Sequence, residues 1–187
     1  MPSANFVHSD DAPPVLVPPI NFSLVVPGIY RSGHPNKKNF SFLRRLNLSG
    51  VIYLENESEA YRSDSSNFIL DNGLKLYRYD LSKESNLFTR EGSSKLNNLL
   101  EIILDKRNYP LLLHDDTGKG TVSLVCALIR RMQNWSLTGA FAEGDLFAGP
   151  AGGSEGVGLG EAGMEFIASF EPKKVKFDRA NKPDWVD

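Results

Sequence analysis

The most informative segment of this 187-residue chain reads Asn108-Tyr109-Pro110-Leu111-Leu112-Leu113-His114-Asp115-Asp116-Thr117-Gly118-Lys119-Gly120-Thr121-Val122-Ser123-Leu124-Val125. Pro110 precedes an apolar run that is too short for a helix, so 111–114 is expected to be a buried strand. Apolar residues then recur at three- and four-residue spacing from 122 to 132, which predicts a deeply packed helix. A short polar loop therefore joins a buried strand to a buried helix.

That loop has the composition of a phosphate-binding loop. Gly118 and Gly120 lie in it, and the backbone N–H groups of such a loop converge with those of the following helix N-terminus. Two carboxylates, Asp115 and Asp116, stand where a bound anion would be expected. The segment therefore combines an anion-binding backbone with acidic side chains.

The rest of the chain alternates strands with helices. Strands are expected at 23–26, 28–31, 51–54, 74–80 and 111–114, and helices at 36–46, 67–72, 89–109, 122–134, 138–147 and 164–170. This alternation implies an α/β fold with a central parallel sheet flanked by helices. We divide the chain into a flexible N-terminal arm (1–19), one domain (20–171) with a Gly-rich loop (148–163), and a C-terminal tail (172–187).

Bulk composition argues against several classes of function. The formal net charge of −2 gives no electrostatic reason to bind nucleic acid or an anionic membrane. No apolar run approaches the roughly 20 residues that span a bilayer, and the N-terminus does not have the pattern of a signal peptide, so a cytoplasmic protein is expected. Cys126 is the single cysteine, which leaves neither a disulfide framework nor a zinc cluster. We expect Cys126 to be a core residue, and we expect no metal and no cofactor.

A series of short segments carries a family pattern. They are Pro18-Pro19-Ile20-Asn21-Phe22, Gly28-Ile29-Tyr30-Arg31-Ser32-Gly33-His34-Pro35, Asn39-Phe40-Ser41-Phe42-Leu43, Val51-Ile52-Tyr53-Leu54, Pro110–His114 and Trp135-Ser136-Leu137-Thr138. In this order they resemble the plant and fungal atypical dual-specificity phosphatases, and most of all the fungal oxidant-induced cell-cycle arrest proteins. The resemblance covers about residues 18–171. It implies the cysteine-phosphatase (dual-specificity phosphatase-like) α/β fold.

Active members of this family carry a signature of His-Cys, five residues, Arg, and then Thr or Ser. Here His114 matches the histidine, and Gly118 and Lys119 match the Gly-Lys commonly found inside the loop. Asp115 falls on the cysteine position and Thr121 on the arginine position. No catalytic residue of the cysteine mechanism is therefore intact in the degenerate loop, which consists of His114, Asp115, Asp116, Thr117, Gly118, Lys119, Gly120 and Thr121.

The two substitutions replace both groups on which the cysteine mechanism depends. That mechanism needs a low-pKa thiolate at a helix N-terminus and an arginine that binds the equatorial oxygens bidentately. A carboxylate is a weaker nucleophile toward a phosphate dianion, and near a protein surface like charges about 4 Å apart repel by about 4 kcal/mol. We therefore predict a pseudophosphatase that is not an enzyme. It would act as a regulatory or scaffolding subunit in inositol pyrophosphate or stress and cell-cycle signalling, and the family implies paralogous phosphatase-like subunits as its protein partners.

Two other interpretations use the same segment. An Asp-Asp-Thr-Gly run after a strand also fits an aspartyl-phosphate enzyme, so the alternative is an active phosphatase on phosphoprotein or inositol pyrophosphate that uses Asp115 with Mg²⁺. That chemistry needs further acidic ligands and a lysine from later strands, whereas a Gly-rich loop and short helices follow residue 134. A nucleotide-binding P-loop is excluded, because Leu113 stands where its first glycine should be.

Other titratable residues near the loop are assigned structural roles. We expect His114 to hydrogen-bond the loop backbone, since neither His8 nor His34 lies at a ligand-like spacing from it. Asp80 and Glu84 lie near the loop that bears a general acid in related phosphatases, and we expect both to be surface residues.

Three cations are candidates for ligand binding. Arg31, Lys83 and Lys119 could form a basic rim for a phosphorylated small molecule. The family implies inositol pyrophosphates as one class of such ligands. The alternative is that these residues are scattered surface cations.

Overall fold

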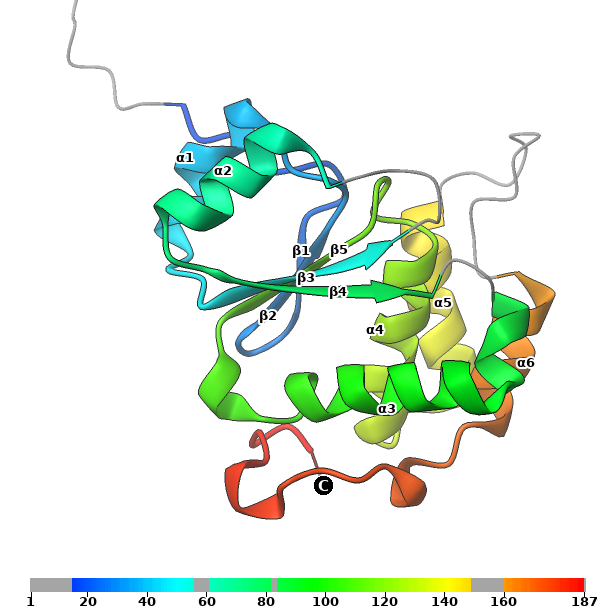
Figure 1. Ribbon diagram of the computed structural model, residues 1–187. Coiled ribbons are helices and arrows are strands. Elements are labelled where there is room, and N and C mark those ends of the chain that lie inside the picture. The colour runs from blue at the N-terminus through cyan, green and yellow to red at the C-terminus, as the bar shows by residue number, and fades with distance from the viewer. Residues whose placement is uncertain (1–14, 56–60, 82–83, 149–159, 187) are drawn as a thin grey trace, which may run out of the picture.

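The computed structural model describes residues 15–55, 61–81, 84–148 and 160–186. Within these ranges the strands form one five-stranded sheet in the order β1-β2-β5-β3-β4 (Figure 1). The strands are β1 (Ser23–Val26), β2 (Ile29–Ser32), β3 (Gly50–Glu55), β4 (Lys75–Asp80) and β5 (Leu111–His114). The β2-β5, β5-β3 and β3-β4 pairs are parallel, so the predicted α/β fold is confirmed. The edge strand β1 runs antiparallel to β2, because the turn at Pro27-Gly28 reverses the chain.

Six α-helices connect and cover these strands in the described ranges. They are α1 (Phe40–Arg45), α2 (Ser63–Asp71), α3 (Arg90–Ile103), α4 (Thr121–Met132), α5 (Leu137–Ala148) and α6 (Glu161–Ser169). The helix predicted for 89–109 ends earlier, at Ile103. The reason is a separate 3₁₀ turn, η3 (Lys106–Asn108), in which the Asp105 side chain accepts a hydrogen bond from the Arg107 N–H.

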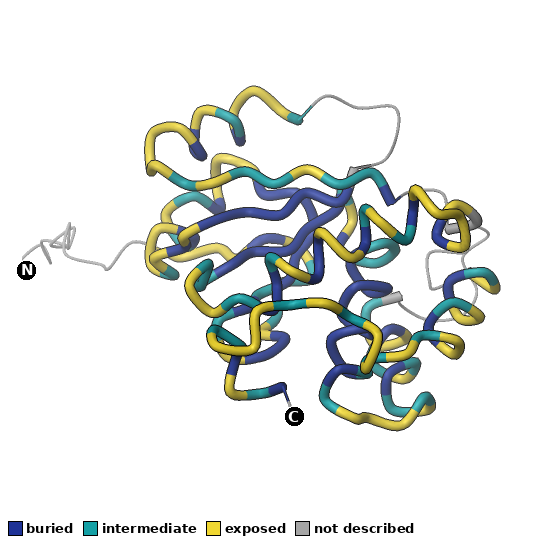
Figure 2. The backbone as a smooth tube through the Cα atoms, turned by 60° about the horizontal axis from the view of Figure 1, so that its bottom comes forward, coloured by how far each residue is buried: buried dark blue, intermediate teal, exposed yellow. Residues whose placement is uncertain are grey.

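The helices cover both faces of the sheet. In Figure 1, α1 and α2 lie on one side and α3 to α6 on the other. Successive residues of β5 point to opposite faces: Leu112 packs with the α1–α2 cluster, whereas Leu111 and Leu113 pack with the larger cluster around α3 and α4. In α4 every residue except Thr121 and Arg131 is buried. The central strand β5 is buried throughout, whereas the edge strand β4 has no buried residue, and Figure 2 shows the dark blue of buried residues concentrated in the interior of the fold.

The strand order creates a switch point at the carboxyl end of the sheet. From β3 the chain passes through α2 to β4 on one side, and it returns through α3 to place β5 on the other side of β3. In open α/β sheets, ligands bind outside the carboxyl ends of the strands at such a point. The loop that follows β5 begins there.

The ends of the chain and the Gly-rich segment lie partly outside the described residues. Residues 1–14 of the predicted arm and 149–159 of the predicted Gly-rich loop belong to the ranges that the structure does not describe. In the predicted C-terminal tail, Val186 is buried and Phe177 and Trp185 pack against the core. Among the described helices, none has the length and apolar character needed to cross a membrane.

Candidate functional site

The loop between β5 and α4 lies against the segment that follows β2. The His34 N–H donates to the Asp116 carbonyl at 3.1 Å, and the Asn21 side-chain amide donates to the Thr117 carbonyl at 2.8 Å. Gly118 has a φ of +77°, and a Cβ at this residue would lie 2.5 Å from the backbone nitrogen of Gly33. A glycine is therefore required at 118 for the loop to pack this closely.

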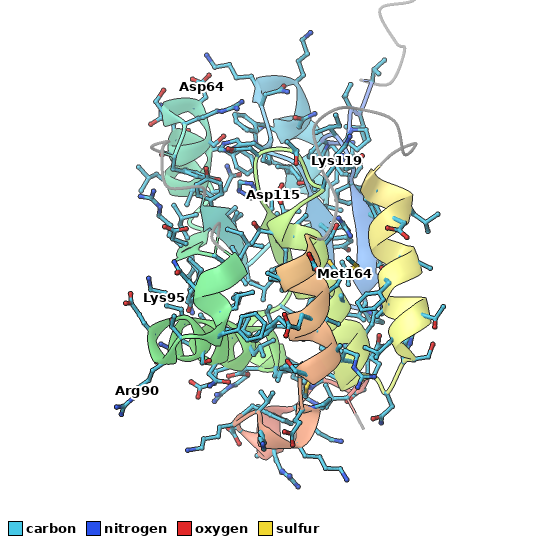
Figure 3. All side chains as sticks on the ribbon, turned by 90° about the vertical axis from the view of Figure 1, so that its right-hand side faces the viewer. Asp64, Arg90, Lys95, Asp115, Lys119 and Met164 are labelled. Atoms are coloured by element: carbon cyan, nitrogen blue, oxygen red, sulfur yellow. The ribbon has the colours of Figure 1, made fainter. Side chains whose placement is uncertain are left out.

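The Asp115 side chain turns into the loop rather than toward solvent (Figure 3). Its Oδ1 accepts hydrogen bonds from the backbone N–H groups of Thr117, at 3.0 Å, and of Gly118, and its Oδ2 accepts one from Val122 at 3.0 Å. We call these three N–H groups the amide cluster. Val122 belongs to the first turn of α4, where unpaired N–H groups and the helix dipole favour an anion. The side chain at the cysteine position thus occupies the anion-binding position of its own loop.

Asp116 points in a different direction from Asp115. Its Oδ1 accepts a hydrogen bond of 3.2 Å from the Tyr53 hydroxyl on β3 and lies 3.4 Å from Nδ1 of His34. We expected both carboxylates to repel a bound phosphate. In the structure each carboxylate instead has its own hydrogen-bonding surroundings within the protein.

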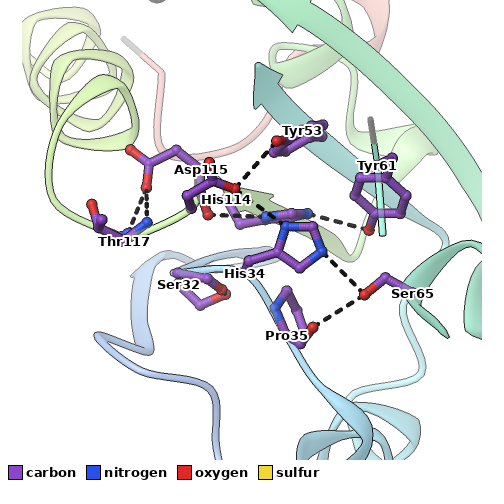
Figure 4. A network of polar contacts seen from close by, with 12 residues as sticks. Ser32, His34, Pro35, Tyr53, Tyr61, Ser65, His114, Asp115 and Thr117 are labelled. Atoms are coloured by element: carbon purple, nitrogen blue, oxygen red, sulfur yellow. Dashed lines mark hydrogen bonds and ion pairs between the residues drawn. The ribbon is translucent and has the colours of Figure 1, made fainter. Parts of the chain in front are cut away.

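Two buried histidines support the loop from the side of β3 and α2 (Figure 4). Nδ1 of His114 lies 3.2 Å from the Asp115 carbonyl, and its Nε2 lies 3.3 Å from the Tyr61 hydroxyl. The His34 ring packs edge-on against His114, and its Nε2 lies 3.1 Å from the hydroxyl oxygen of Ser65. Burial, and then the neighbouring His34, lowers the pKa of His114 from 6.5 to about 3. His114 is therefore neutral at pH 7 and bonds the loop backbone, as expected.

The candidate cations do not form a rim in the described residues. Arg31 is fully buried, because the alternation of side chains along β2 turns it toward α4. Its Nη2 donates to the Gly118 carbonyl at 2.7 Å and to Ser123 Oγ at 2.8 Å. Lys119 is partly exposed on the same loop, and Lys83 lies outside the described residues. Of the three candidate cations, Arg31 thus contacts the loop from the protein interior, whereas Lys119 belongs to the loop and is partly exposed.

Within the part of the chain that the structure describes, the remaining predicted residues contribute no N–H group to the amide cluster. Asp80 is partly exposed at the end of β4, and Glu84 begins the 3₁₀ turn η2 (Glu84–Phe88). Cys126 is buried in α4, and this burial raises the pKa of its thiol to about 11. Its predicted role as a core residue is confirmed.

Several residues of the site were not singled out from the sequence. Tyr53 pairs with His114 in the parallel register of β3 and β5, and Ser32, two residues before His34, pairs with His114 from β2. The carboxyl ends of neighbouring parallel strands meet, so this register was a usable signal for Tyr53 and His34. Tyr61 reaches the site only through tertiary packing, for which the sequence held no such signal.

The described ranges contain no group of three or more His, Cys, Asp or Glu side chains that could hold a metal ion. The described residues therefore do not match a resident metal site.

Comparison with known proteins adds the family. Residues 16–187 match the tyrosine phosphatase family. The chain belongs to this family. It is 39% identical over 138 residues to inositol diphosphatase DSP2 of Oryza sativa, covering 74% of this chain and 67% of that protein. It is 36% identical over 172 residues to inositol diphosphatase SIW14 of Saccharomyces cerevisiae, covering 91% of this chain but only 58% of the relative.

Two further matches concern yeast proteins. The core catalytic domain of SIW14, solved in complex with citrate, superposes with a TM-score of 0.72 at 35% identity, covering 86% of this chain and 91% of that one. The tyrosine-protein phosphatase-like protein OCA2 is 36% identical over 162 residues, covering 83% of this chain and 76% of the relative. The resemblance to plant and fungal atypical phosphatases, and the cysteine-phosphatase-like fold, are both confirmed.

These relatives correct one prediction. The expectation that the chain is not an enzyme is wrong, because the similar proteins are named inositol diphosphatases and include a solved catalytic core. That expectation rested on the cysteine mechanism alone, for which Asp115 and Thr121 are unsuited. The pseudophosphatase assignment built on it gains no support from the comparisons.

Proposed function

We propose that this chain is a phosphatase that acts on an inositol pyrophosphate or a closely related phosphorylated ligand at the loop from Asp115 to Thr121. The observation that carries the proposal is the amide cluster, in which two backbone N–H groups of the loop and one of the first turn of α4 converge on one negatively charged group. Such convergence favours a phosphoryl group. The inositol diphosphatases among the relatives support this class of substrate.

Asp115 would supply the nucleophile. A carboxylate oxygen attacks phosphorus, the bond from phosphorus to the leaving oxygen breaks, and the leaving group departs with its electron pair and takes up a proton. Water then cleaves the resulting acyl phosphate, which releases inorganic phosphate and restores the carboxylate. For this reaction the carboxylate must first leave the amide cluster, whose N–H groups then hold the phosphoryl oxygens.

The test is release of inorganic phosphate from an inositol pyrophosphate and from an aryl phosphate, each with and without Mg²⁺. Wild-type protein is compared with Asp115→Asn, and with Asp64→Asn as a control, because Asp64 lies exposed on α2 and pairs with Lys37. We expect turnover by wild type and by Asp64→Asn, and only background release by Asp115→Asn. Absence of wild-type turnover under every condition, or equal turnover by Asp115→Asn, would refute the proposal.

A second candidate function is regulation within an assembly of paralogous phosphatase-like subunits. The observation in its favour is that the loop holds its own anion, Asp115, in the position that a ligand would take. In that case the chain would change the activity of a partner phosphatase on addition, and Asp115→Asn would do so equally well. The cytoplasmic location expected from the sequence is compatible with both candidate functions.

A further inference from the structure

Arg31 is a fully buried cation that is only partly hydrogen-bonded. Its Nη2 has two acceptors, Gly118 O and Ser123 Oγ. Its Nε and Nη1 are buried and have no hydrogen-bond partner within the described residues. Burying a guanidinium with unpaired donors opposes folding. The position of this side chain therefore calls for an explanation beyond stability.

The surroundings of Arg31 connect it to the amide cluster. Its guanidinium carbon lies 3.6 Å from the centre of the Phe147 ring on α5, which covers it. On the other side, Gly118 accepts a hydrogen bond from Arg31 with its carbonyl and donates one to Asp115 with its N–H. One loop residue thus lies between the buried cation and the carboxylate.

Arg130 shows what a structural arginine looks like in the same fold. It is also largely buried and lies over an aromatic ring, with 4.6 Å from its guanidinium carbon to the centre of the Trp135 ring. Its Nε and Nη2, however, pair with the Glu143 carboxylate, and its Nη1 donates to Gln133. Every nitrogen of that guanidinium is bonded and its charge is matched, which is the contrast with Arg31.

We propose that Arg31 is the positioning residue of the amide cluster. Its guanidinium fixes the Gly118 carbonyl and places a positive charge beneath the loop. This charge substitutes for that of the signature arginine, whose position Thr121 occupies. The ligand class is a phosphate oxyanion, for which the Asp115 carboxylate stands in. The inference rests on the proposed function only for the location of the site. Arg31 acts through the loop and does not itself touch the reacting atoms.

The test measures binding rather than turnover. The Asp115→Ala variant vacates the amide cluster, and its affinity for inorganic phosphate is measured by calorimetry. In this background Arg31→Lys is compared with Arg31→Gln, because both shorten the side chain and remove the guanidinium but only lysine keeps the charge. Arg130→Lys and Arg130→Gln in the same background are the matched controls. We expect phosphate binding by Asp115→Ala, an affinity roughly tenfold weaker with Arg31→Gln than with Arg31→Lys, and no difference between the two Arg130 variants.

A second readout serves if a variant is unstable. In the chain with Asp115 intact, amide hydrogen exchange at Gly118 and Val122 is followed while urea unfolding reports global stability. Arg31→Gln should accelerate exchange at these two amides more than Arg31→Lys does, and more than its loss of global stability explains. Arg130 variants should change these amides only in step with global stability.

Two results would overturn the inference. One is failure of Asp115→Ala to bind phosphate, and the other is equal phosphate affinity and equal loop exchange in Arg31→Lys and Arg31→Gln. Because Asp115→Ala lacks the proposed nucleophile, neither result depends on turnover. Failure of the proposed reaction in wild-type protein would leave this test intact.

Discussion

The Tyr53 hydroxyl donates a hydrogen bond of 3.2 Å to the Asp116 carboxylate, and this contact ties strand β3 to the loop that follows β5. The Tyr53 side chain is 1% exposed, so water has little access to replace the bond. The same oxygen, Oδ1, lies 3.4 Å from Nδ1 of His34. The second acidic residue of the loop is therefore held by the sheet and by the segment after β2.

Removal of this hydroxyl should loosen the loop at little cost to the fold. For Tyr53→Phe we expect a loss of about 1 kcal/mol in the free energy of unfolding, the usual contribution of one hydrogen bond, together with faster amide exchange in the loop. Urea denaturation and hydrogen exchange would measure both effects. Tyr77→Phe is the control, because Tyr77 packs on the core without a hydroxyl partner in the described residues. An equal loss in the two variants would contradict the assigned role of the Tyr53 hydroxyl.

Asp115→Asn should destabilise the protein more than Asp116→Asn does. An asparagine at 115 has one acceptor oxygen, so its amide N–H₂ would face a backbone donor of the amide cluster. Hydrogen bonds to a charged group contribute about 1.5–3 kcal/mol, and we expect a loss of about 2 kcal/mol. Asp116 is partly exposed, so its loss should be smaller. Urea denaturation of both variants checks the order, and the reverse order would show that Asp115 does not organise the loop.

His114 should make the stability depend on pH in the acid range. The unfolded histidine binds a proton near its ordinary pKa of 6.5, whereas the pKa of folded His114 is lowered to about 3. At a pH between these two pKa values the unfolded chain binds a proton at this histidine and the folded chain does not. As the pH falls below 6.5, this group therefore lowers the free energy of unfolding by up to about 1.4 kcal/mol per pH unit. In His114→Gln that contribution is absent. The stability difference between wild type and variant should then narrow from pH 7 to pH 4 in urea denaturation; a constant difference would count against the buried neutral histidine.

The buried ion pair of Arg130 and Glu143 tests whether removing one partner destabilises the fold more than removing both. Their side chains are 10% and 16% exposed, and both carboxylate oxygens accept from the guanidinium. Arg130→Met leaves the carboxylate without its partner, and we expect a loss of about 3 kcal/mol. The double variant Arg130→Met/Glu143→Leu should recover most of that loss, because no unpaired charge remains. Thermal unfolding of the single and double variants checks this, and a double variant no better than the single one would contradict it.

Cys126 should be inert in the folded protein. Burial raises the pKa of its thiol to about 11, so almost none is thiolate at pH 8, and the surrounding helices block a reagent. We expect no reaction with an aromatic disulfide reagent at pH 8 until urea unfolds the chain, after which one thiol reacts. Rapid labelling of the folded protein would show that α4 opens locally.

The sequence was sufficient to predict the unit around β5. The predicted strand 111–114 and helix 122–134 correspond to Leu111–His114 and Thr121–Met132. Both elements are buried on every side, so a short apolar run and a helical apolar repeat identify them without tertiary information. The convergence of N–H groups was also foreseeable, since a Gly-containing loop and the helix N-terminus that follows it both present unpaired backbone N–H groups.

The sequence could not predict which side chains approach that cluster. Arginine is rarely buried, so a candidate exposed rim was the natural expectation for Arg31, and only the packing of β2 against α4 shows otherwise. The fit of the Asp115 carboxylate to three N–H groups depends on the path of the loop, including the positive φ of Gly118. The wrong prediction about enzymatic activity has another origin. It assumed that a protein of this fold can act as a phosphatase only through the cysteine mechanism.

The order of the strands also governs how the sheet can assemble. Among the strands that the structure describes, β5 comes last in the sequence, yet it lies in the middle of the sheet and pairs with both β2 and β3. Before residues 111–114 leave the ribosome, the described strands of a nascent chain can form the β1-β2 hairpin and the β3-β4 pair, but the strand that joins these two pairs is still missing. Such long-range pairing slows folding. The segment that carries the candidate site therefore joins two separate halves, and the site forms in the same event that completes the sheet.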